Sequence, residues 1–325
     1  APIAAPMAPT PPSPTTQTKT FTLLRHGQST WNAAGRIQGS SDFSQLTPKG
    51  QSQARRSAEH IVSLGWSEGF DAVWSSTLTR ARQTADIVLP SLSPSRSGDG
   101  DALAYKLNAA LREIDLYSFQ GLDKNAVPEE IRDAYAAWKA DPAAFEIDGH
   151  RPVVELWDRA AAAWRDLRGD AGTNTLVVAH NAVNQALLCT AMGLPPSAFR
   201  KVLQTNAAVS RLTFDGDGGD DGDDGDGAVI VQCINRAPEN VVKSAQKEQA
   251  LLVVSCGELR LADAAREAAF GPRATVVEVD AAACDRIMKE RLRVTRSDVS
   301  FACEEGGLTI FGDDELLTFN SLSLV

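Results

Sequence analysis

Residues 21–32 have the sequence FTLLRHGQSTWN, in which an apolar run gives way abruptly to charged and polar residues. The run from Thr20 to Leu24 is rich in β-forming residues and predicts a short buried strand. This strand delivers Arg25 and His26 into a tight turn at Gly27, where glycine suits a backbone that turns sharply or approaches a ligand closely. We therefore expect a strand whose carboxyl end presents an arginine and a histidine.

Short apolar runs alternate with helical spacing along much of the chain. The runs at 70–75 and 175–179 are continuous and apolar, which is typical of strands covered on both faces. The alternation predicts an α/β protein, a three-layer αβα sandwich with a mostly parallel sheet. Apolar residues recur at helical spacing in residues 48–64, in the segment that ends at 89, and in 127–140, 153–168 and 181–192.

The composition excludes several classes of protein. A chain of 325 residues with 43% hydrophobic residues can form a core, which excludes a wholly disordered protein. A formal net charge of -10 excludes a general nucleic-acid binder, because phosphate backbones require clustered cations. No apolar run approaches the ~20 residues of a membrane span, so we expect a soluble protein. Five cysteines without a CxxC pair indicate neither a disulfide framework nor a zinc site.

One acidic segment accounts for most of the net charge of -10. Residues 215–226 hold seven aspartates and no cation, between strand-like runs at 209–214 and 228–234. We expect a hairpin whose solvated tip is an acidic insertion at 215–227. The functional alternative is a calcium loop, but an EF-hand needs Gly at its sixth position and a terminal Glu. The sixth position here is Asp220 and no Glu follows, which favours the solvated tip.

Two histidines stand at the ends of predicted strands. His26 follows the first strand, and His180 directly follows the run at 175–179. These are two of the four histidines in the chain. In open α/β sheets the carboxyl ends of the strands form the ligand crevice, so both histidines can face one pocket. The strand at 70–75 leads into Arg80, which adds a cation at the same edge.

This set of residues suits phosphoryl transfer. A neutral imidazole can attack phosphorus, and nearby arginines can bind a dianionic phosphate and stabilise the charge of the transition state. The arginines also oppose protonation of the histidine, which keeps its lone pair available. A carboxylic acid is then needed to protonate the departing oxygen.

Several separated segments resemble the histidine phosphatase superfamily, the phosphoglycerate-mutase-like group. The resemblance extends over about residues 20–235 and implies a phosphomonoesterase that works through a phosphohistidine. The segments that carry it are RHGQSTWN (25–32), IQGSSDFSQLTPKGQSQA (37–54), SSTLTRARQTA (75–85), LREIDLYSFQGL (111–122) and VVAHNAVNQALL (177–188).

The resemblance implies roles for individual residues. His26 is the expected nucleophile, and Glu113 is the expected general acid and base. The phosphate pocket is expected from Arg25, Arg80 and His180, which neutralise charge, so we expect no metal and no other cofactor. Further phosphate or substrate contacts are expected from Asn32, Gln38, Gly39 and Asn181.

A narrower resemblance concerns the substrate. LREIDLYSFQGL and FEIDGHRPVVELWDRA (145–160) are similar to a plant chloroplast branch of the superfamily that dephosphorylates a sugar acid. It implies a small sugar or sugar-acid phosphate as substrate and the chloroplast stroma as location. Arg36 and His150 are candidates to bind the carboxylate of such a substrate.

Two other functions remain open. One is a phosphoglycerate-mutase-type phosphotransferase, which passes the phosphate to another hydroxyl group instead of water. The segment LYSFQGL does not resemble the mutase version, which favours hydrolysis. The other is a non-catalytic phosphate-binding or interaction scaffold, and the complete set of catalytic residue types argues against it.

The predicted catalytic domain covers residues 20–235. Residues 1–19 precede it, carry six of the 16 prolines and predict a disordered tail, whose lack of acidic residues fits the end of a transit peptide. A polar linker is expected at 236–249. The sequence leaves the oligomeric state open.

Residues 250–325 predict a small C-terminal α/β module, with helical runs near 259–270 and 281–292. Its segment LLVVSCGEL (251–259) resembles FTLLRHGQS, with Cys256 in the position of the histidine. This likeness suggests a degenerate repeat, for which we expect no phosphatase activity.

Overall fold

The computed structural model describes residues 18–67, 69–92, 105–202, 204–215 and 228–237, together with six strands between residues 251 and 320. Several predicted features lie outside the described residues. They are almost all of the N-terminal tail, the tip of the acidic hairpin, nearly all of the linker, and the two C-terminal helical runs apart from Leu292, which begins a strand. The predicted division into domains stays a prediction.

Seven strands form the main sheet, in the order β3-β2-β4-β1-β5-β6-β9. The pairings of β5 with β1 and with β6 are antiparallel, and the others are parallel. The predicted mostly parallel sheet is thus confirmed. The strands are β1 (Lys19–Arg25), β2 (Ala72–Ser76), β3 (Lys106–Asn108), β4 (Asn174–Ala179), β5 (Val209–Asp215), β6 (Ala228–Arg236) and β9 (Leu292–Val294).

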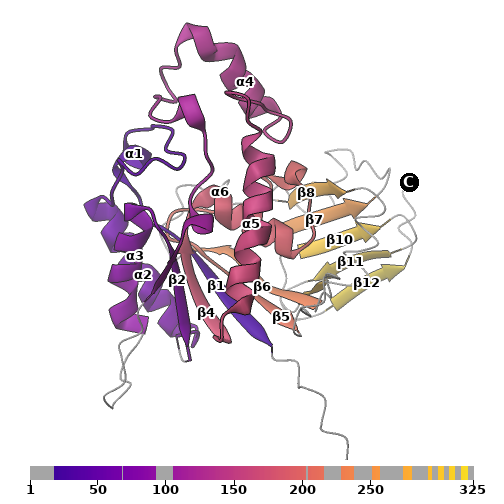
Figure 1. The fold of residues 1–325 in the computed structure, drawn as a ribbon. Coiled ribbons are helices and arrows are strands. Elements are labelled where there is room, and N and C mark those ends of the chain that lie inside the picture. The colour runs from indigo at the N-terminus through magenta and orange to yellow at the C-terminus, as the bar shows by residue number, and fades with distance from the viewer. Residues whose placement is uncertain are drawn as a thin grey trace, which may run out of the picture.

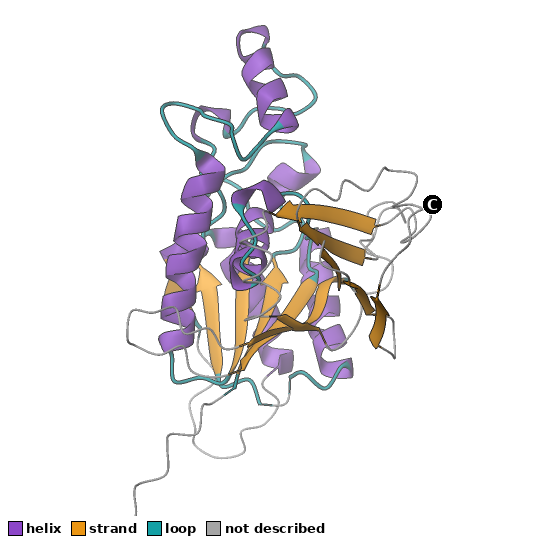
Figure 2. Ribbon diagram, turned by 90° about the vertical axis from the view of Figure 1, so that its right-hand side faces the viewer, coloured by secondary structure: helices purple, strands orange, loops and turns teal. Residues whose placement is uncertain are grey.

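Helices cover both faces of this sheet, as a three-layer sandwich requires (Figures 1 and 2). Helices α2 and α3 pack together on one face, and α5 and α6 pack together on the other. The helices of the described residues are α1 (Thr30–Ala33), α2 (Pro48–Ser63), α3 (Thr79–Leu92), α4 (Arg132–Ala140), α5 (Pro152–Gly169) and α6 (Asn181–Ala191).

The first strand shows how the sequence pattern builds the two layers. Successive side chains of a strand point to opposite faces of the sheet. Phe21 and Leu23 accordingly belong to the core shared with α5 and α6, whereas Leu24 belongs to the core shared with α2 and α3. All three are fully buried, which explains why the strand reads as continuously apolar.

Two helices begin at residues that fit a helix start. The Thr47 side chain accepts a hydrogen bond from the backbone N–H of Gly50 at 3.0 Å, and Pro48 occupies the first helical position. Helix α5 likewise begins at Pro152. The predicted helix at 127–140 is shorter than expected: a single 3-10 turn follows Pro128, and α4 begins at Arg132.

The connections that follow the strands change from one face of the sheet to the other at the β1–β4 pair. These strands are parallel neighbours, yet β1 leads into α2 on one face and β4 leads into α6 on the other. A crevice opens at such a switch point, outside the carboxyl ends of the strands. Helix α4 and its connecting loops stand over this edge of the sheet (Figure 1).

A second sheet lies in the C-terminal part. Its strands have the order β12-β11-β10-β7-β8 and comprise β7 (Leu251–Cys256), β8 (Ala274–Val279), β10 (Val299–Cys303), β11 (Gly307–Phe311) and β12 (Leu316–Asn320). Strand β7 has parallel neighbours on both sides, whereas β1 has one parallel and one antiparallel neighbour. The two sheets therefore differ in topology around the strands whose sequences are alike.

No helix in the described part of the chain is long and apolar enough to cross a membrane.

The turn after β1 is packed directly against the backbone of α2. A Cβ atom at Gly27 would lie 2.2 Å from the carbonyl oxygen of Gly50, and one at Gly50 would lie 2.0 Å from the carbonyl oxygen of Gln28. Position 27 therefore requires glycine, because two backbone segments approach each other too closely to leave room for a Cβ atom.

We predict that Gly27→Ala lowers the free energy of unfolding by about 1–3 kcal/mol, because the added methyl group overpacks this contact. Urea denaturation measures the change. Gly169→Ala is the matched control, since a Cβ there would meet nothing within 4 Å. An unchanged urea midpoint for Gly27→Ala would contradict the contact.

Candidate active site

A pocket of about 400 Å³ lies at the carboxyl edge of the main sheet. Of the residues predicted for the site, the lining contains both members of the Arg25–His26 pair and Glu113. Arg80 and His180 lie behind them, fully buried. The remaining predicted residues in the lining are Asn32, Arg36, Gln38, Gly39 and Asn181.

His26 is held by backbone contacts from two other segments. Its N–H donates to the carbonyl oxygen of Ala179 at 3.0 Å, and its carbonyl oxygen accepts from the N–H of Ala207 at 3.2 Å. The ring Nδ1 lies 2.6 Å from the carbonyl oxygen of Gly27. A carbonyl oxygen can only accept, so Nδ1 carries the proton and Nε2 bears the free lone pair.

The imidazole of His26 is neutral. Burial lowers its pKa well below the usual range, and the charges of Arg80 and Arg25 lower it further, although the hydrogen bond to Gly27 acts in the opposite direction. The same edge holds a second neutral ring, His180, with the two ring centroids 5.1 Å apart. Burial, then the charge of Arg80, lowers the pKa of His180 well below its usual range.

The two arginines are fixed by backbone carbonyl groups. One terminal nitrogen of Arg25 donates to Gln204 at 2.6 Å. The terminal nitrogens of Arg80 donate to Ser41 at 2.8 Å and to Gly39 at 2.9 Å, which fastens the 39–41 loop to α3. The Nε atom of each arginine is buried without a partner. Burial lowers the pKa of Arg25 to about 10, so it stays charged near neutral pH.

Glu113 sits on the amino end of α6. Its Oε1 accepts from the backbone N–H groups of Ala182 at 2.9 Å, Ile114 at 3.0 Å and Val183 at 3.2 Å, whereas Oε2 has a single contact, to Ala182 at 3.2 Å. The N–H groups and dipole of a helix amino end stabilise a carboxylate. Oε2 is therefore the freer oxygen of this side chain.

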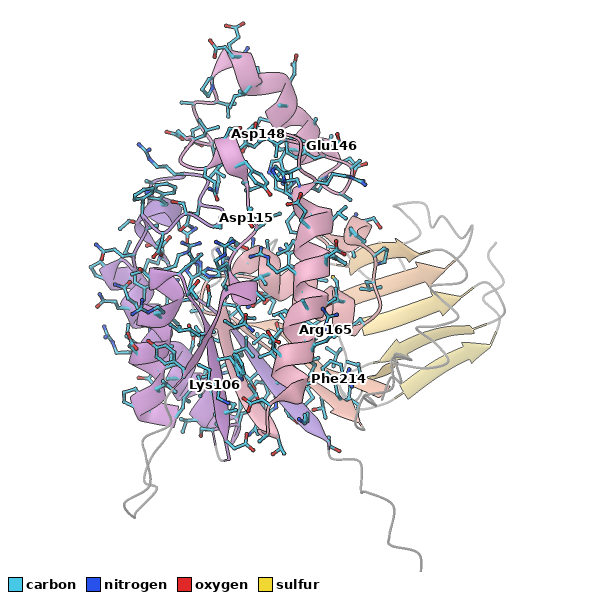
Figure 3. All side chains as sticks on the ribbon, in the orientation of Figure 1. Lys106, Asp115, Glu146, Asp148, Arg165 and Phe214 are labelled. Carbon is cyan, nitrogen blue, oxygen red and sulfur yellow. The ribbon has the colours of Figure 1, made fainter. Side chains whose placement is uncertain are left out.

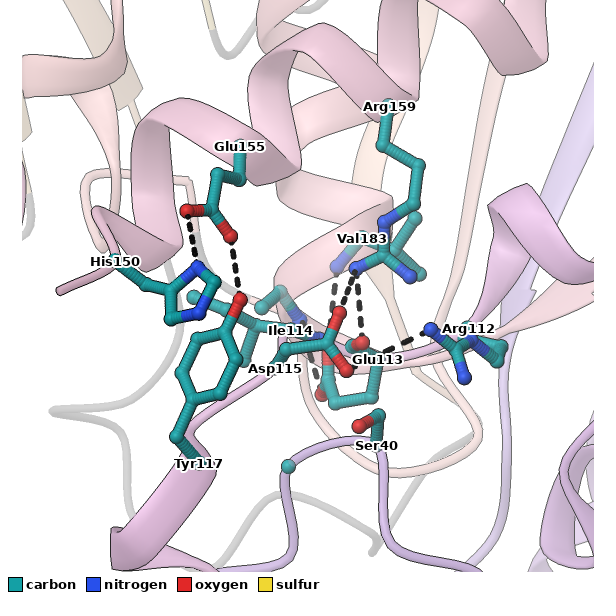
Figure 4. A network of polar contacts seen from close by, with 12 residues as sticks. Ser40, Arg112, Glu113, Ile114, Asp115, Tyr117, His150, Glu155, Arg159 and Val183 are labelled. Atoms are coloured by element: carbon teal, nitrogen blue, oxygen red, sulfur yellow. Dashed lines mark hydrogen bonds and ion pairs between the residues drawn. The ribbon is translucent and has the colours of Figure 1, made fainter. Parts of the chain in front are cut away.

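The backbone around Glu113 is held from α5 (Figure 4). Arg159 donates to the carbonyl oxygen of Glu113 at 2.9 Å and lies 3.9 Å from the Asp115 carboxylate, which also faces Arg112 at 3.6 Å. Both the backbone and the carboxylate of Glu113 are thus fixed before any ligand binds.

Three amide side chains of the lining share one polarity. The Oδ1 atom of Asn32 accepts from Asn206, the Oε1 atom of Gln38 accepts from Ser29, and the Oδ1 atom of Asn181 accepts from Gln185. Each carbonyl oxygen is occupied, so each NH₂ group is the end left for a ligand. Three donors of this kind favour an anion.

The pocket lining carries more positive than negative charge. Besides Arg25, it includes Arg36, Lys124, Lys139 and Arg200, whereas Glu113 is the one acidic residue among the described residues of the lining. Burial, then the charge of Arg25, lowers the pKa of Lys124. Apart from Arg25 and Arg36, these cations were not expected from the sequence. The available signal was that Lys124 lies two residues after the end of the LREIDLYSFQGL segment.

Arg200 ties α4 to the pocket wall. Its guanidinium stacks on the Trp138 ring at 4.4 Å and donates to the carbonyl oxygen of Trp138 at 3.0 Å. Its backbone N–H donates to Gln185, which in turn donates to Asn181. One chain of contacts therefore joins the end of α4 to the amino end of α6.

His150 lies apart from this pocket. It is half-exposed, stacks on the Tyr117 ring with centroids 4.0 Å apart, and pairs with the Glu155 carboxylate at 3.0 Å (Figure 4). Its neighbours Glu146 and Asp148 lie on the loop beyond Asp115, away from the sheet (Figure 3). The structure thus brings together ten of the eleven predicted residues, and His150 is the one that it leaves outside.

No group of three or more His, Cys, Asp or Glu side chains that could hold a metal ion occurs among the residues with a described placement. The positive charges at the predicted phosphate site are those of Arg25 and Arg80.

The chain belongs to the histidine phosphatase superfamily (branch 1), whose family model matches residues 21–220. It is 50% identical over 204 residues to a probable 2-carboxy-D-arabinitol-1-phosphatase of Arabidopsis thaliana, and 43% identical over 234 residues to a 2-carboxy-D-arabinitol-1-phosphatase of Triticum aestivum. The matches cover 62% and 72% of this chain but 40% and 44% of those proteins. The chain therefore spans less than half the length of either.

Other relatives agree with this family. A probable phosphoglycerate mutase of an Enterobacter strain is 33% identical, with 59% of this chain and 83% of that protein covered. A solved mycobacterial hydrolase has a TM-score of 0.57 at 23% identity, over 69% of this chain and 93% of that chain, which shows the fold. A mycobacterial glucosyl-3-phosphoglycerate phosphatase, solved with VO3, has a TM-score of 0.50 at 27% identity, over 60% and 92%.

We predict that neither His26 nor His180 takes up a proton as the pH falls from 8 to 6.5. The lowered pKa of each ring means that protonation begins only at a lower pH. Imidazole NMR resonances recorded as a function of pH test this, with His26→Ala and His180→Ala used to assign the signals. A titration midpoint at or above 6.5 for either ring would show that burial and the arginines do not keep it neutral.

Proposed function

We propose that this protein is a phosphomonoesterase that works through a phosphohistidine at His26. The observation that carries the proposal is the fixed tautomer of His26. Its Nδ1–H is bound by the carbonyl oxygen of Gly27, so a neutral Nε2 faces the pocket beside Arg25 and Arg80. A nucleophile on phosphorus needs this free lone pair.

In the first step, Nε2 of His26 attacks the phosphorus in line with the ester oxygen. The N–P bond forms as the P–O bond breaks, and the departing oxygen takes a proton from Glu113. The arginines and the amide NH₂ groups stabilise the charge on the equatorial oxygens. Oε2, which accepts fewer hydrogen bonds than Oε1, is the oxygen that delivers this proton.

In the second step, a water molecule hydrolyses the phosphohistidine. The Glu113 carboxylate removes a proton from the water as its oxygen attacks phosphorus, and the P–N bond breaks. Inorganic phosphate leaves, and His26 returns to its neutral Nδ1–H form. One carboxyl group serves as acid and then as base, as microscopic reversibility of the two half-reactions allows.

We propose a small sugar-acid phosphate, such as 2-carboxy-D-arabinitol 1-phosphate, as the substrate. The names of the two plant relatives support this choice, as do the cations of the pocket lining. A substrate with a carboxylate besides its phosphate would use Arg36 and Lys124 in addition to the phosphate site. The likeness to these plant enzymes also supports a location in the chloroplast stroma.

A mutase remains the second candidate, because a probable phosphoglycerate mutase is among the relatives. The two reactions share the phosphohistidine and differ in whether water or a second hydroxyl group accepts the phosphate. An acid quench with labelled substrate distinguishes them. Release of labelled phosphate supports hydrolysis, labelled isomeric product supports a mutase, and no phosphoenzyme at all supports a non-catalytic scaffold.

We predict that Glu113→Gln reduces kcat about 10²- to 10⁴-fold, because the amide can neither donate nor accept the catalytic proton. With p-nitrophenyl phosphate, whose leaving group needs little protonation, the labelled phosphoenzyme should accumulate. Rapid acid quench measures it. His26→Ala should form none, and Glu146→Gln, on an exposed side chain, is the matched control.

Rapid turnover without a phosphoenzyme in Glu113→Gln, or any phosphoenzyme in His26→Ala, would contradict these roles. Turnover in excess EDTA tests independently whether the arginines suffice without a metal ion.

We predict that Lys124→Met reduces kcat/KM for 2-carboxy-D-arabinitol 1-phosphate about 10- to 100-fold, the value of a hydrogen bond to a charged group. The loss should be small for arabinitol 1-phosphate, which differs in lacking the carboxylate. Lys49→Met, on the exposed side of α2, controls for the loss of one lysine. An equal loss for both substrates would show that Lys124 does not recognise the carboxylate.

A further inference from the structure

The two ring nitrogens of His180 have different surroundings. Nε2 lies 2.7 Å from the hydroxyl oxygen of Ser76, the last residue of β2. Nδ1 is buried and has no hydrogen-bond partner among the residues that the structure describes. A neutral imidazole carries one ring proton, so the site must hold that proton on one of these nitrogens.

The hydroxyl group of Ser76 decides between the two tautomers. Its oxygen already accepts from the backbone N–H of Leu78 at 3.2 Å. If Ser76 donates its own proton to Nε2 of His180, every polar hydrogen except Nδ1–H is paired. If Nε2–H were the donor, the Ser76 hydroxyl hydrogen and the bare Nδ1 would both be buried without partners. Buried unpaired groups are costly, so the first arrangement is favoured.

We propose that Ser76 is a positioning residue, which holds His180 as the Nδ1–H tautomer so that it can donate a hydrogen bond to the transferring phosphoryl group. The proposal rests on the proposed phosphohistidine chemistry. His180 then acts as a neutral donor next to the nucleophile, and a phosphoryl oxygen supplies the acceptor that Nδ1 lacks among the described residues.

The two histidines then have complementary surroundings. At His26 a carbonyl oxygen holds Nδ1–H and leaves Nε2 free to attack. At His180 a hydroxyl group occupies Nε2 and leaves Nδ1–H free to donate. Both rings are protonated on Nδ1. The protein binds Nδ1–H at His26 but Nε2 at His180, so opposite edges of the two rings are left without a protein partner. The last residue of β2 therefore sets the function of the residue that directly follows β4.

Nitrogen NMR of the full-length protein tests the tautomer directly, because protonated and bare ring nitrogens resonate far apart. The chain has four histidines, so the substitutions His60→Asn and His150→Asn leave only the rings of His26 and His180 to assign. We expect Nδ1–H at His180 in the unsubstituted protein. Ser76→Ala should move part of that proton to Nε2, and Ser76→Thr, which keeps the hydroxyl group, should restore it.

Ligand affinity provides the second readout. Ser76→Ala should weaken orthovanadate binding and lower kcat/KM about 10- to 100-fold, the range found when the partner that orients a functional histidine is removed. Ser75→Ala is the matched control. Ser75 is equally buried in the same strand, and its hydroxyl group donates to the backbone carbonyl of Ser76 rather than to a histidine.

The proposal is overturned if His180 carries Nε2–H in the unsubstituted protein, or if Ser76→Ala leaves both the tautomer and the orthovanadate affinity unchanged. Equal losses of affinity in Ser76→Ala and Ser75→Ala would also overturn it. A protein that shows the expected tautomer and orthovanadate affinities but forms no phosphoenzyme would support the role of Ser76 and reject the proposed function, so the two failures are distinguishable.

Discussion

The site depends on the parallel pairing of β1 with β4. In this register Arg25 lies opposite Ala179, and the N–H of His26 donates to the carbonyl oxygen of Ala179. The pairing extends past the end of β1, so the residues that follow the two strands start from neighbouring positions. The rings of His26 and His180 are therefore 5.1 Å apart although 153 residues separate them in the chain. Because the chain leaves the two strands toward opposite faces of the sheet, a crevice opens between them at this point.

Burial gives the site its chemical character. The rings of His26 and His180 and the guanidinium group of Arg80 are at most 1% exposed, and loss of hydration is the largest cause of the lowered pKa of each. Burial affects the residue types unequally. It turns the histidines into neutral groups, whereas the arginines keep their charge because their ordinary pKa is so much higher. An anion-binding site with a neutral nucleophile follows from burying these two residue types together at one edge of the sheet.

The surrounding polar groups are oriented by contacts with the protein itself. The amides of Asn32, Gln38 and Asn181 have their oxygens occupied, and Glu113 is held by the amino end of α6. Such groups need little reorganisation when charge develops on a phosphoryl group, which is the physical basis of electrostatic catalysis. The chain of contacts from Asn181 through Gln185 to Arg200 extends this order to α4, which contributes to the pocket lining.

The sequence by itself determined the α/β class and the strands that lead into His26 and His180, because buried parallel strands appear in a sequence as short apolar runs. It also determined the family, because the motifs are local. The sequence pattern predicted that α4 begins at residue 127, whereas it begins at Arg132. It also missed the three-residue edge strand β3, because Lys106 and Leu107 are exposed and no apolar run marks the strand. Only the tertiary structure decided which cations face the pocket. Lys124 and Arg200 lie on loops far apart in the chain, and His150 has the right chemistry but turns to Tyr117 and Glu155. The physical reason is that a strand or helix repeats with a period visible in the sequence, whereas the direction of a loop side chain is set by the contacts that it finds after folding.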